Sequence, residues 1–335
     1  MSVVDKENMT NNKGSSEIDE SLFNIFIDAL KYSPSKLISV FMNLMLVPIY
    51  TALLTPHEYG AYNVSIAVLS FIAIIFSDWV GISGLRFFEK HHNTNNLRPY
   101  FSTLLFLICS NLAVMYICIF LFFDKITEFF KISGDLLYLV TLLVIPVAFR
   151  SLLFQVLRAQ IRPLAYSVIV VLNQLLTVGL GYYFIKYFDM GAVGILLGMA
   201  LSIGLVDIIM FLMTKMWSSS QIRLIDKETL KGFYSYGIPI AASSLGMWVV
   251  TQSNKLVLQY YHGSFFNGLA GVGYNLTFSI LFSIFSLFTL AAIPRVIKAY
   301  EAGKDVKPVI SGMTAYYITF LHLLFLYTAI SQRVL

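Results

Sequence analysis

Charged residues are scarce in this chain. They make up 12% of its 335 residues, whereas hydrophobic residues make up 58%. A soluble domain carries about 25% charged residues, so the composition excludes an ordinary soluble fold. The mean hydropathy of +0.76 indicates a membrane protein instead. The formal net charge of +5 does not point to a nucleic-acid partner, because the basic residues lie in short gaps between apolar runs.

Cysteine is also rare. Cys109 and Cys118 lie within one apolar run, which excludes a disulfide framework and any metal-ligand spacing. Paired carboxylates, glycine-rich phosphate loops and Ser-His-Asp arrangements are missing from the water-facing segments, so the sequence predicts no catalytic residue, no cofactor and no metal. His91 and His92 have no third ligand beside them and are expected to be solvated loop residues.

Long apolar runs dominate the rest of the chain. A bilayer core about 30 Å thick requires roughly 20 apolar helical residues, and these runs do not alternate as barrel strands would. The runs cover residues 33–54, 60–83, 100–123, 136–157, 163–185, 191–214, 233–260, 265–293 and 309–330. The sequence therefore predicts an all-α integral membrane protein with about nine transmembrane helices.

Basic residues mark one side of the predicted membrane. The gaps on that side, which include the amino terminus, hold Lys6, Lys13, Lys31, Arg86, Lys90, Arg98, Arg158, Arg162, Lys215, Arg223, Lys227, Lys231, Arg295, Lys298, Lys304 and Lys307. The other side holds Lys125, Lys131 and Lys186, apart from Arg333 near the end. Since cytoplasmic loops are enriched in lysine and arginine, the amino terminus is predicted to be cytoplasmic.

Residues 272–288 are similar in sequence to residues 60–76, and the two segments align at an offset of 212 without a gap. The pair Tyr62-Asn63 falls on Tyr274-Asn275, and beyond the apolar run Arg86 and Glu89 fall on Lys298 and Glu301. This internal repeat makes the eighth helix the counterpart of the second, and the seventh helix the counterpart of the first. Both copies enter the membrane from the same side, so the repeats are predicted to be parallel, related by an axis along the membrane normal.

This repeat suggests a division of the chain. Residues 1–20 are expected to be a disordered cytosolic leader and 21–216 a first lobe of six helices. Residues 217–231 are then a cytoplasmic linker between the lobes, and 232–335 an incomplete second lobe of three helices. Half of a second parallel-repeat lobe is thus expected, either because the protein is naturally reduced or because the sequence is truncated; truncation is the favoured interpretation.

Five ionisable residues fall within the predicted spans, where each costs roughly 3 kcal/mol at the bilayer centre. One of them, Lys36, shares a face of the first helix with Ser39, Asn43 and Tyr50. A polar stripe along a spanning helix should face water or protein rather than lipid. Two interpretations stay open for Lys36: it reaches the headgroups, or it lines a polar cavity.

Lys255 repeats this arrangement on the seventh helix. Trp248, Gln252 and Gln259 share its face at spacings of three and four, and the same two interpretations apply. Because the first and seventh helices are counterparts in the repeat, their two stripes suggest two walls of one polar cavity between the lobes.

Arg150, Asp78 and Asp207 are the other three residues. Asp78 and Arg150 lie in the inner thirds of their helices and are expected to form an ion pair within the first lobe, with Lys36 as another partner for Asp78. Asp207 is either a proton- or cation-binding group or a polar residue that its neighbours satisfy.

The sequence resembles a known family at several ordered segments. "VPIYTALLTPHEYGAYNV" (47–64), "GLRFFEKH" (84–91), "VLRAQIRPLAYSVIVVLNQLL" (156–176), "MGAVGILLGMALS" (190–202), "NKLVLQYYHGSFFNGLAGVGYNLTFSI" (254–280) and "IPRVIKAYE" (293–301) carry the resemblance. They are similar to Wzx-type polysaccharide flippases of the polysaccharide-transporter branch of the multidrug/oligosaccharidyl-lipid/polysaccharide (MOP) exporter superfamily.

The resemblance implies two six-helix lobes around a cationic cavity in the bacterial cytoplasmic membrane. The implied activity is flipping of undecaprenyl-diphosphate-linked oligosaccharide for O-antigen, capsule or exopolysaccharide synthesis, with membrane lipids and polysaccharide polymerase or assembly proteins as partners. Lys36 and Lys255 then hold the diphosphate, with Arg150 a poorer candidate. Asn254-Lys255 replaces the family's frequent Asp-Arg, which removes bidentate phosphate geometry.

Three other functions stay open. An exporter of small amphipathic cations would share the fold, but its cavity would favour carboxylates over Lys36 and Lys255. A membrane glycan polymerase or ligase would handle a similar substrate, but the outer loops here are short. An inactive, truncated flippase remnant would fit the early end of the chain.

Overall fold

The computed structural model is all-helical over the residues it describes. These are 38, 41–42, 45–46, 48–94, 96–214, 216, 224–301, 305–307, 309–312, 314–319 and 322, with only some side chains within 276–301. The leader 1–20 and the candidates Lys36, Ser39 and Asn43 lie outside the described residues. The number of nine spans and the division into lobes stay predictions.

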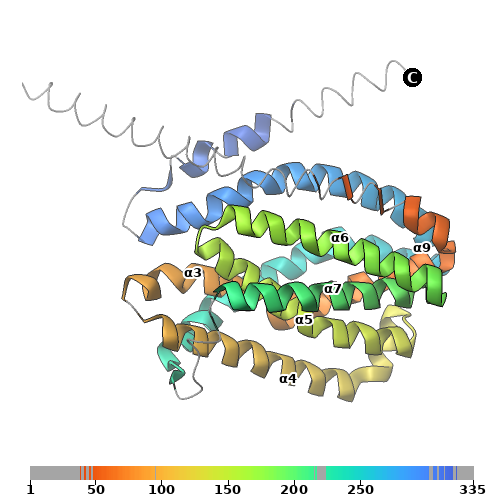
Figure 1. Cartoon of the computed structure of the whole chain (residues 1–335), viewed down its shortest axis with the longest axis horizontal. Coiled ribbons are helices and arrows are strands. Elements are labelled where there is room, and N and C mark those ends of the chain that lie inside the picture. The colour runs from red at the N-terminus through yellow and green to blue at the C-terminus, as the bar shows by residue number, and fades with distance from the viewer. Residues whose placement is uncertain are drawn as a thin grey trace, which may run out of the picture.

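The main helices follow the predicted apolar runs. They are α2 (Pro56–Ala73), a π-helical turn η1 (Ile74–Asp78), α3 (Trp79–Asn93), α4 (Leu97–Phe130), α5 (Gly134–Ala159), α6 (Pro163–Phe188), α7 (Gly191–Thr214) and α9 (Lys227–Glu301). Helices α4, α5, α6 and α7 run alongside one another, with α7 against α5 and α6 (Figure 1). Five stretches among the described residues are long and apolar enough to cross a membrane.

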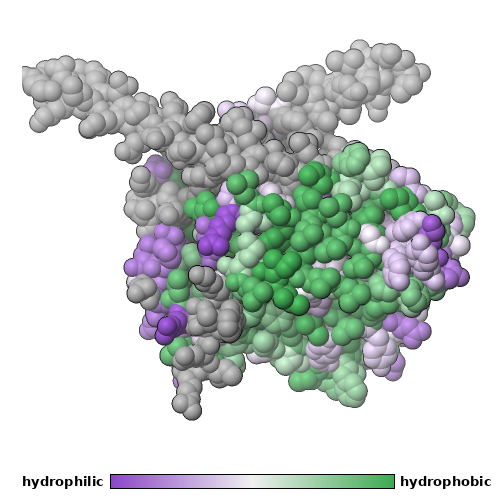
Figure 2. Space-filling view, viewed as in Figure 1, coloured by the Kyte–Doolittle hydropathy of each residue, from purple (hydrophilic) through white to green (hydrophobic). Residues whose placement is uncertain are grey.

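The surface agrees with a membrane setting. Figure 2 shows a broad apolar band, with polar residues gathered toward the two ends of the helices. On α4, Phe120 is 84% exposed and Leu121 is 66% exposed. Apolar side chains exposed in a continuous band are expected to face lipid. The chain is a multi-pass membrane protein.

The start of α2 shows how local sequence sets an element boundary. The Thr55 hydroxyl accepts a hydrogen bond from the Glu58 backbone N–H at 3.3 Å, and the Glu58 carboxylate accepts one from the Thr55 N–H at 2.8 Å. This capping box satisfies two backbone donors that the first helical turn leaves free. Pro56 fits the first helical position, where no N–H is needed.

Helix α9 consists of two helices that meet at a break in the backbone. Gly263 breaks it with φ 75° and ψ −179°, a backbone conformation that glycine adopts without steric cost. We call residues 227–262 the helix-seven segment and residues 264–301 the helix-eight segment. The break falls between the two predicted runs 233–260 and 265–293, so the chain turns back at the predicted outer face.

One expectation at the predicted cytoplasmic end is wrong. His91 was expected to be solvated, but it is 7% exposed. Its Nε2 lies 2.9 Å from the Thr229 hydroxyl, and its ring packs beside Tyr100. The start of α9 covers this histidine, and that contact joins residues 138 positions apart. Sequence spacing alone gave no sign of it.

Asp226 caps the start of α9 and yields a pH-dependent prediction. Hydrogen bonds from the Thr229 hydroxyl and from backbone N–H groups lower the pKa of Asp226. The pKa of an aspartate in the unfolded chain is about 3.9. Because the pKa of Asp226 is lower in the folded protein, its carboxylate stabilises the fold fully above about pH 3.9, and this stabilisation is lost as the pH falls through the folded pKa. Asp226→Ala should therefore reduce stability at pH 7 by about 1 kcal/mol, and by less below about pH 4.

Thermal unfolding of the parent and of Asp226→Ala in detergent, at pH 7 and below about pH 4, measures this effect. Asp226→Asn is the matched control, because asparagine caps helices about as well as aspartate but carries no charge. An Asp226→Ala deficit that stays the same at low pH would show that the carboxylate charge plays no part.

Candidate functional site

Lys255 is a buried cation on the helix-seven segment. It is 6% exposed, and its Nζ lies 5.7 Å from the centre of the Tyr274 ring. The Tyr274 hydroxyl donates to the Thr251 carbonyl at 2.9 Å, which fixes the ring. Among the residues with described side chains, no carboxylate forms an ion pair with this ammonium. A cation–π contact offsets only part of the cost of burying it.

The rest of the predicted helix-seven face also lies against protein. Trp248 is 8% exposed, and its indole N–H donates to the Ala67 carbonyl at 3.1 Å and to the Ser70 hydroxyl at 3.0 Å. The Gln252 side-chain oxygen is buried without a partner among the described residues. Gln259 donates to the Ser264 hydroxyl at 3.0 Å. This placement favours a polar junction between helices over side chains that reach for headgroups.

Asn63 and Asn275 meet between α2 and the helix-eight segment. The Asn275 amide donates to the Asn63 side-chain oxygen at 3.2 Å, and to the Tyr59 hydroxyl at 3.4 Å. Asn63 in turn donates to the Asn267 carbonyl at 3.5 Å. The two asparagines are the pair that the repeat offset of 212 aligns. Equivalent residues contact each other where a twofold axis passes, so this bond lies where the predicted repeats would place their axis.

Glycines let the two backbones approach closely beside this axis. A Cβ atom added to Gly60 would overlap the Ser264 carbonyl oxygen, and one added to Gly268 would overlap the Pro56 carbonyl oxygen. A Cβ on Gly271 would overlap the Asn63 amide. Small residues at helix crossings permit this contact within membranes. The predicted outer ends of α2 and the helix-eight segment are thus closed against each other.

Tyr50 is the described residue of the predicted helix-one stripe. It is 4% exposed, and its ring lies edge-on to Tyr62 with 6.2 Å between centres. Tyr62 also packs against Tyr59, whose hydroxyl receives the Asn275 bond. Tyr50 therefore lies beside the junction that Asn63 and Asn275 mark.

Arg150, Asp78 and Asp207 form a separate cluster inside the first six helices. Both carboxylates are electrostatic neighbours of Arg150, whose Nη1 donates to the Asn173 side-chain oxygen at 3.4 Å. Asp78 lies near enough to Arg150 for their charges to interact, and the expected ion pair between them stays a prediction. Asp207 is 8% exposed, and its oxygens have no hydrogen-bond partner among the described residues. Because two carboxylates lie near it, Arg150 is a weaker candidate for binding an anion than Lys255.

Sequence reasoning did not identify two parts of this arrangement. The π-helical turn η1 ends at Asp78 and precedes α3; an extra residue in a helical turn leaves no composition signal. Asn63 and Asn275 occupy equivalent positions in the aligned repeat, and this equivalence could have identified them as candidates for residues at the predicted axis.

Comparisons with known proteins agree with this architecture. The family model described as "Polysaccharide biosynthesis protein" matches residues 28–299. No curated protein matches the chain at a significant level.

Solved structures of MATE transporters share the fold. A mutant of the Vibrio cholerae transporter VcmN superposes with a TM-score of 0.60 at 13% identity, covering 84% of this chain and 66% of that one. The eukaryotic transporter AtDTX14 gives 0.57 at 19% identity, covering 89% and 68%. An inward-facing multidrug resistance MATE transporter of the MOP superfamily gives 0.53 at 17%, covering 80% and 60%. The chain spans about two thirds of the length of these structures.

Proposed function

Since this chain belongs to the polysaccharide biosynthesis protein family, and it shares its fold with MATE transporters, we propose that it flips a lipid-linked oligosaccharide across the bacterial cytoplasmic membrane. The proposed cargo is an undecaprenyl-diphosphate-linked saccharide, moved from the cytoplasmic to the outer leaflet. Lys255 and Lys36 hold the diphosphate, and the movement requires no covalent catalysis.

The observation that carries the proposal is the buried ammonium of Lys255. It lies at 6% exposure without an anionic partner among the described side chains. A buried cation of this kind requires an anion to offset its desolvation, and a diphosphate supplies one. The exporter of small cations is less favoured, because a cationic cargo would add a like charge beside Lys255.

Physical chemistry explains why such a lipid needs a protein path. Neither a diphosphate nor a glycan can cross hydrocarbon without great cost. A polar junction between two repeats offers water and fixed positive charge, while the isoprenoid tail stays in lipid. Rocking of the two repeats that parts the closed outer ends at Asn63 and Asn275 in one state, and closes them again in the other, would expose this junction to each side in turn.

A reconstitution assay tests the proposed cargo. The purified full-length protein is placed in liposomes with a fluorescent polyprenyl-diphosphate saccharide, and an impermeant quencher reports label that reaches the outer leaflet. We expect protein-dependent movement of this lipid and no efflux of a fluorescent organic cation. Cation efflux without lipid movement would show that the alternative transporter function is correct.

A further inference from the structure

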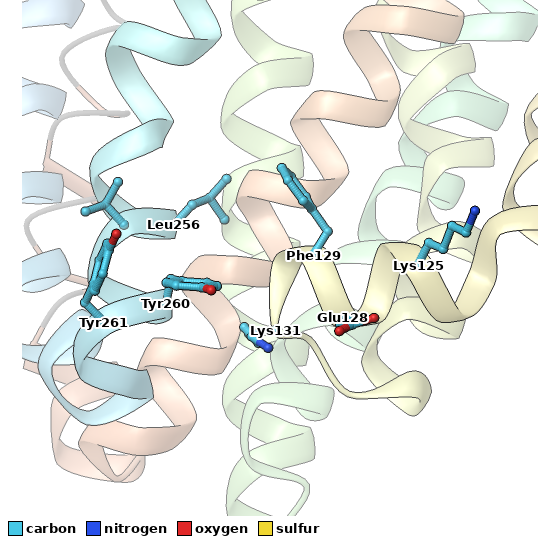
Figure 3. A pocket seen from close by; sticks show the side chains of 8 residues that line it. Lys125, Glu128, Phe129, Lys131, Leu256, Tyr260 and Tyr261 are labelled. Atoms are coloured by element: carbon cyan, nitrogen blue, oxygen red, sulfur yellow. The ribbon is translucent and has the colours of Figure 1, made fainter.

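A groove lies where α4 ends against the helix-seven segment, at the predicted outer face. We call it the outer groove; its cavity volume is about 560 Å³. It is lined by Lys125, Glu128, Phe129, Lys131, Leu256, Val257, Tyr260 and Tyr261. Figure 3 shows Tyr260 close to Lys131, with Glu128 and Lys125 following along α4. The Gln259 amide donates to the Lys131 carbonyl at 3.3 Å and ties the two walls together.

The charge of the outer groove is unusual for its side of the membrane. Only three lysines lie in the predicted outer gaps, and the outer groove contains two of them, Lys125 and Lys131. Glu128 offsets one charge, which leaves the lining at +1. Topology alone disfavours basic residues on the outer side. Lys131 points toward Tyr260 (Figure 3). The Lys125 ammonium instead points away from them and lies over the Phe122 ring. A cation beside Tyr260 on this side of the membrane indicates an anionic ligand.

Lys131 also has a backbone conformation that glycine adopts more easily than lysine. It ends α4 with φ 50° and ψ 43°, in the left-handed region. Glycine is common at such a helix end, whereas other L-residues there cost roughly 1 kcal/mol or more. A lysine in this conformation carries local strain that glycine would not, as do Ile161 and Asp189. The Lys131 Nζ lies 5.5 Å from the centre of the Tyr260 ring.

The remaining lining fits an amphipathic ligand. Tyr260 is 61% exposed and Tyr261 is 73% exposed, and both rings border the groove. Leu256 and Val257 directly follow Lys255 along the helix-seven segment, so the groove begins within one helical turn of the buried cation. A headgroup leaving Lys255 toward the outer side would next meet these lysines and rings.

We propose that the outer groove binds the phosphate-bearing headgroup of a lipid in the outer leaflet. The Lys131 ammonium contacts the phosphate oxygens, and Lys125 adds positive charge further along α4. The tyrosine rings pack against the adjoining sugar or glycerol, and the tail stays in the bilayer. Assigning this lipid as the exported isoprenoid diphosphate saccharide rests on the proposed function. An anionic phospholipid presents the same phosphate chemistry, and the experiment separates the two.

Binding titrations on purified full-length protein test the outer groove. Three probes are used: farnesyl diphosphate, farnesol, and short-chain phosphatidylglycerol. The Lys255→Met background removes the buried cation, so that the outer groove dominates the signal. We expect farnesyl diphosphate to bind and farnesol to bind much more weakly. Lys131→Gly relieves the backbone strain but removes the ammonium, and it should weaken diphosphate binding about tenfold. Adding Tyr260→Ala to Lys131→Gly should weaken binding further.

Matched controls isolate the groove lysines. Lys186→Ala removes the third outer lysine, and Asp189→Gly relieves another left-handed position, at φ 52°; neither should change binding. Phosphatidylglycerol binding as tight as farnesyl diphosphate, with the same dependence on Lys131, would support the headgroup site and assign it to membrane phospholipid. Unchanged diphosphate affinity in both Lys131→Gly and Lys125→Ala would overturn the proposal.

The same variants separate this inference from the proposed function. If Lys255→Met flips lipid as well as the parent while Lys131→Gly still loses diphosphate binding, the buried cation is not the transport site and the outer groove assignment stands. If Lys255→Met abolishes flipping and Lys131→Gly binds normally, the transport site stands and the outer groove assignment is wrong.

Discussion

Replacing Lys255 with methionine is expected to abolish lipid flipping while leaving the protein folded. Methionine has a similar length and packs well against the Tyr274 ring, but it carries no charge. Loss of a charged contact to the diphosphate should reduce transport about 10- to 100-fold. Lys255 has no ion-pair partner among the described side chains, and its removal relieves a desolvation cost of up to about 3 kcal/mol, so thermal stability should stay equal or rise. Reconstituted flipping and thermal unfolding in detergent measure the two effects.

The opposing directions of these effects make the prediction specific. If Lys255 had only a structural role, its replacement would lower the thermal stability of the protein, and transport would fall for that reason. Lys255→Arg keeps the charge and should keep part of the activity, and Lys231→Ala removes an exposed lysine of the same segment as a control. Full transport by Lys255→Met would refute the role of this residue in binding cargo.

Gly268→Leu is expected to disrupt the closure between α2 and the helix-eight segment. Even a Cβ atom at this position overlaps the Pro56 carbonyl oxygen, which belongs to a backbone that cannot move aside cheaply. Overpacking of this kind costs roughly 1–3 kcal/mol. We expect reduced thermal stability and loss of transport, because the outer ends can no longer come together.

Gly273→Leu is the matched control for this variant. It lies five residues further along the same segment, and a Cβ there meets no described atom within 4 Å. The helical setting and the added volume are the same, so the comparison isolates the contact with α2. Equal stability and transport in the two leucine variants would show that the close approach at Gly268 is unimportant.

Much of the architecture follows from apolar runs and the repeat. The runs 100–123 and 136–157 predict α4 and α5, since spans of this length can only be satisfied as helices in lipid. The aligned Tyr-Asn pairs predicted parallel repeats, and the bond between Asn63 and Asn275 supports that relation. Lys255 was recognisable because a lysine within a span requires an explanation.

Other features depend on contacts that no local pattern encodes. His91 is polar and lies at a helix end, yet Thr229 and Tyr100 bury it from other elements. The outer groove joins Lys131 to Tyr260 across 129 positions of sequence. The resemblance to flippases implied a cationic path, and the positions of Lys36, Ser39 and Asn43 within it stay predictions.

The most direct test of the account is a reversible cross-link between positions 63 and 275. Cysteines replace Asn63 and Asn275 in full-length protein in which Cys109 and Cys118 have become serine, and each single-cysteine protein serves as a control. We expect a short bifunctional thiol reagent to join the two helices, to stop lipid flipping, and to release it when a reductant cleaves the link. Undiminished flipping by the cross-linked protein would contradict the claim that the two repeats must separate at this axis.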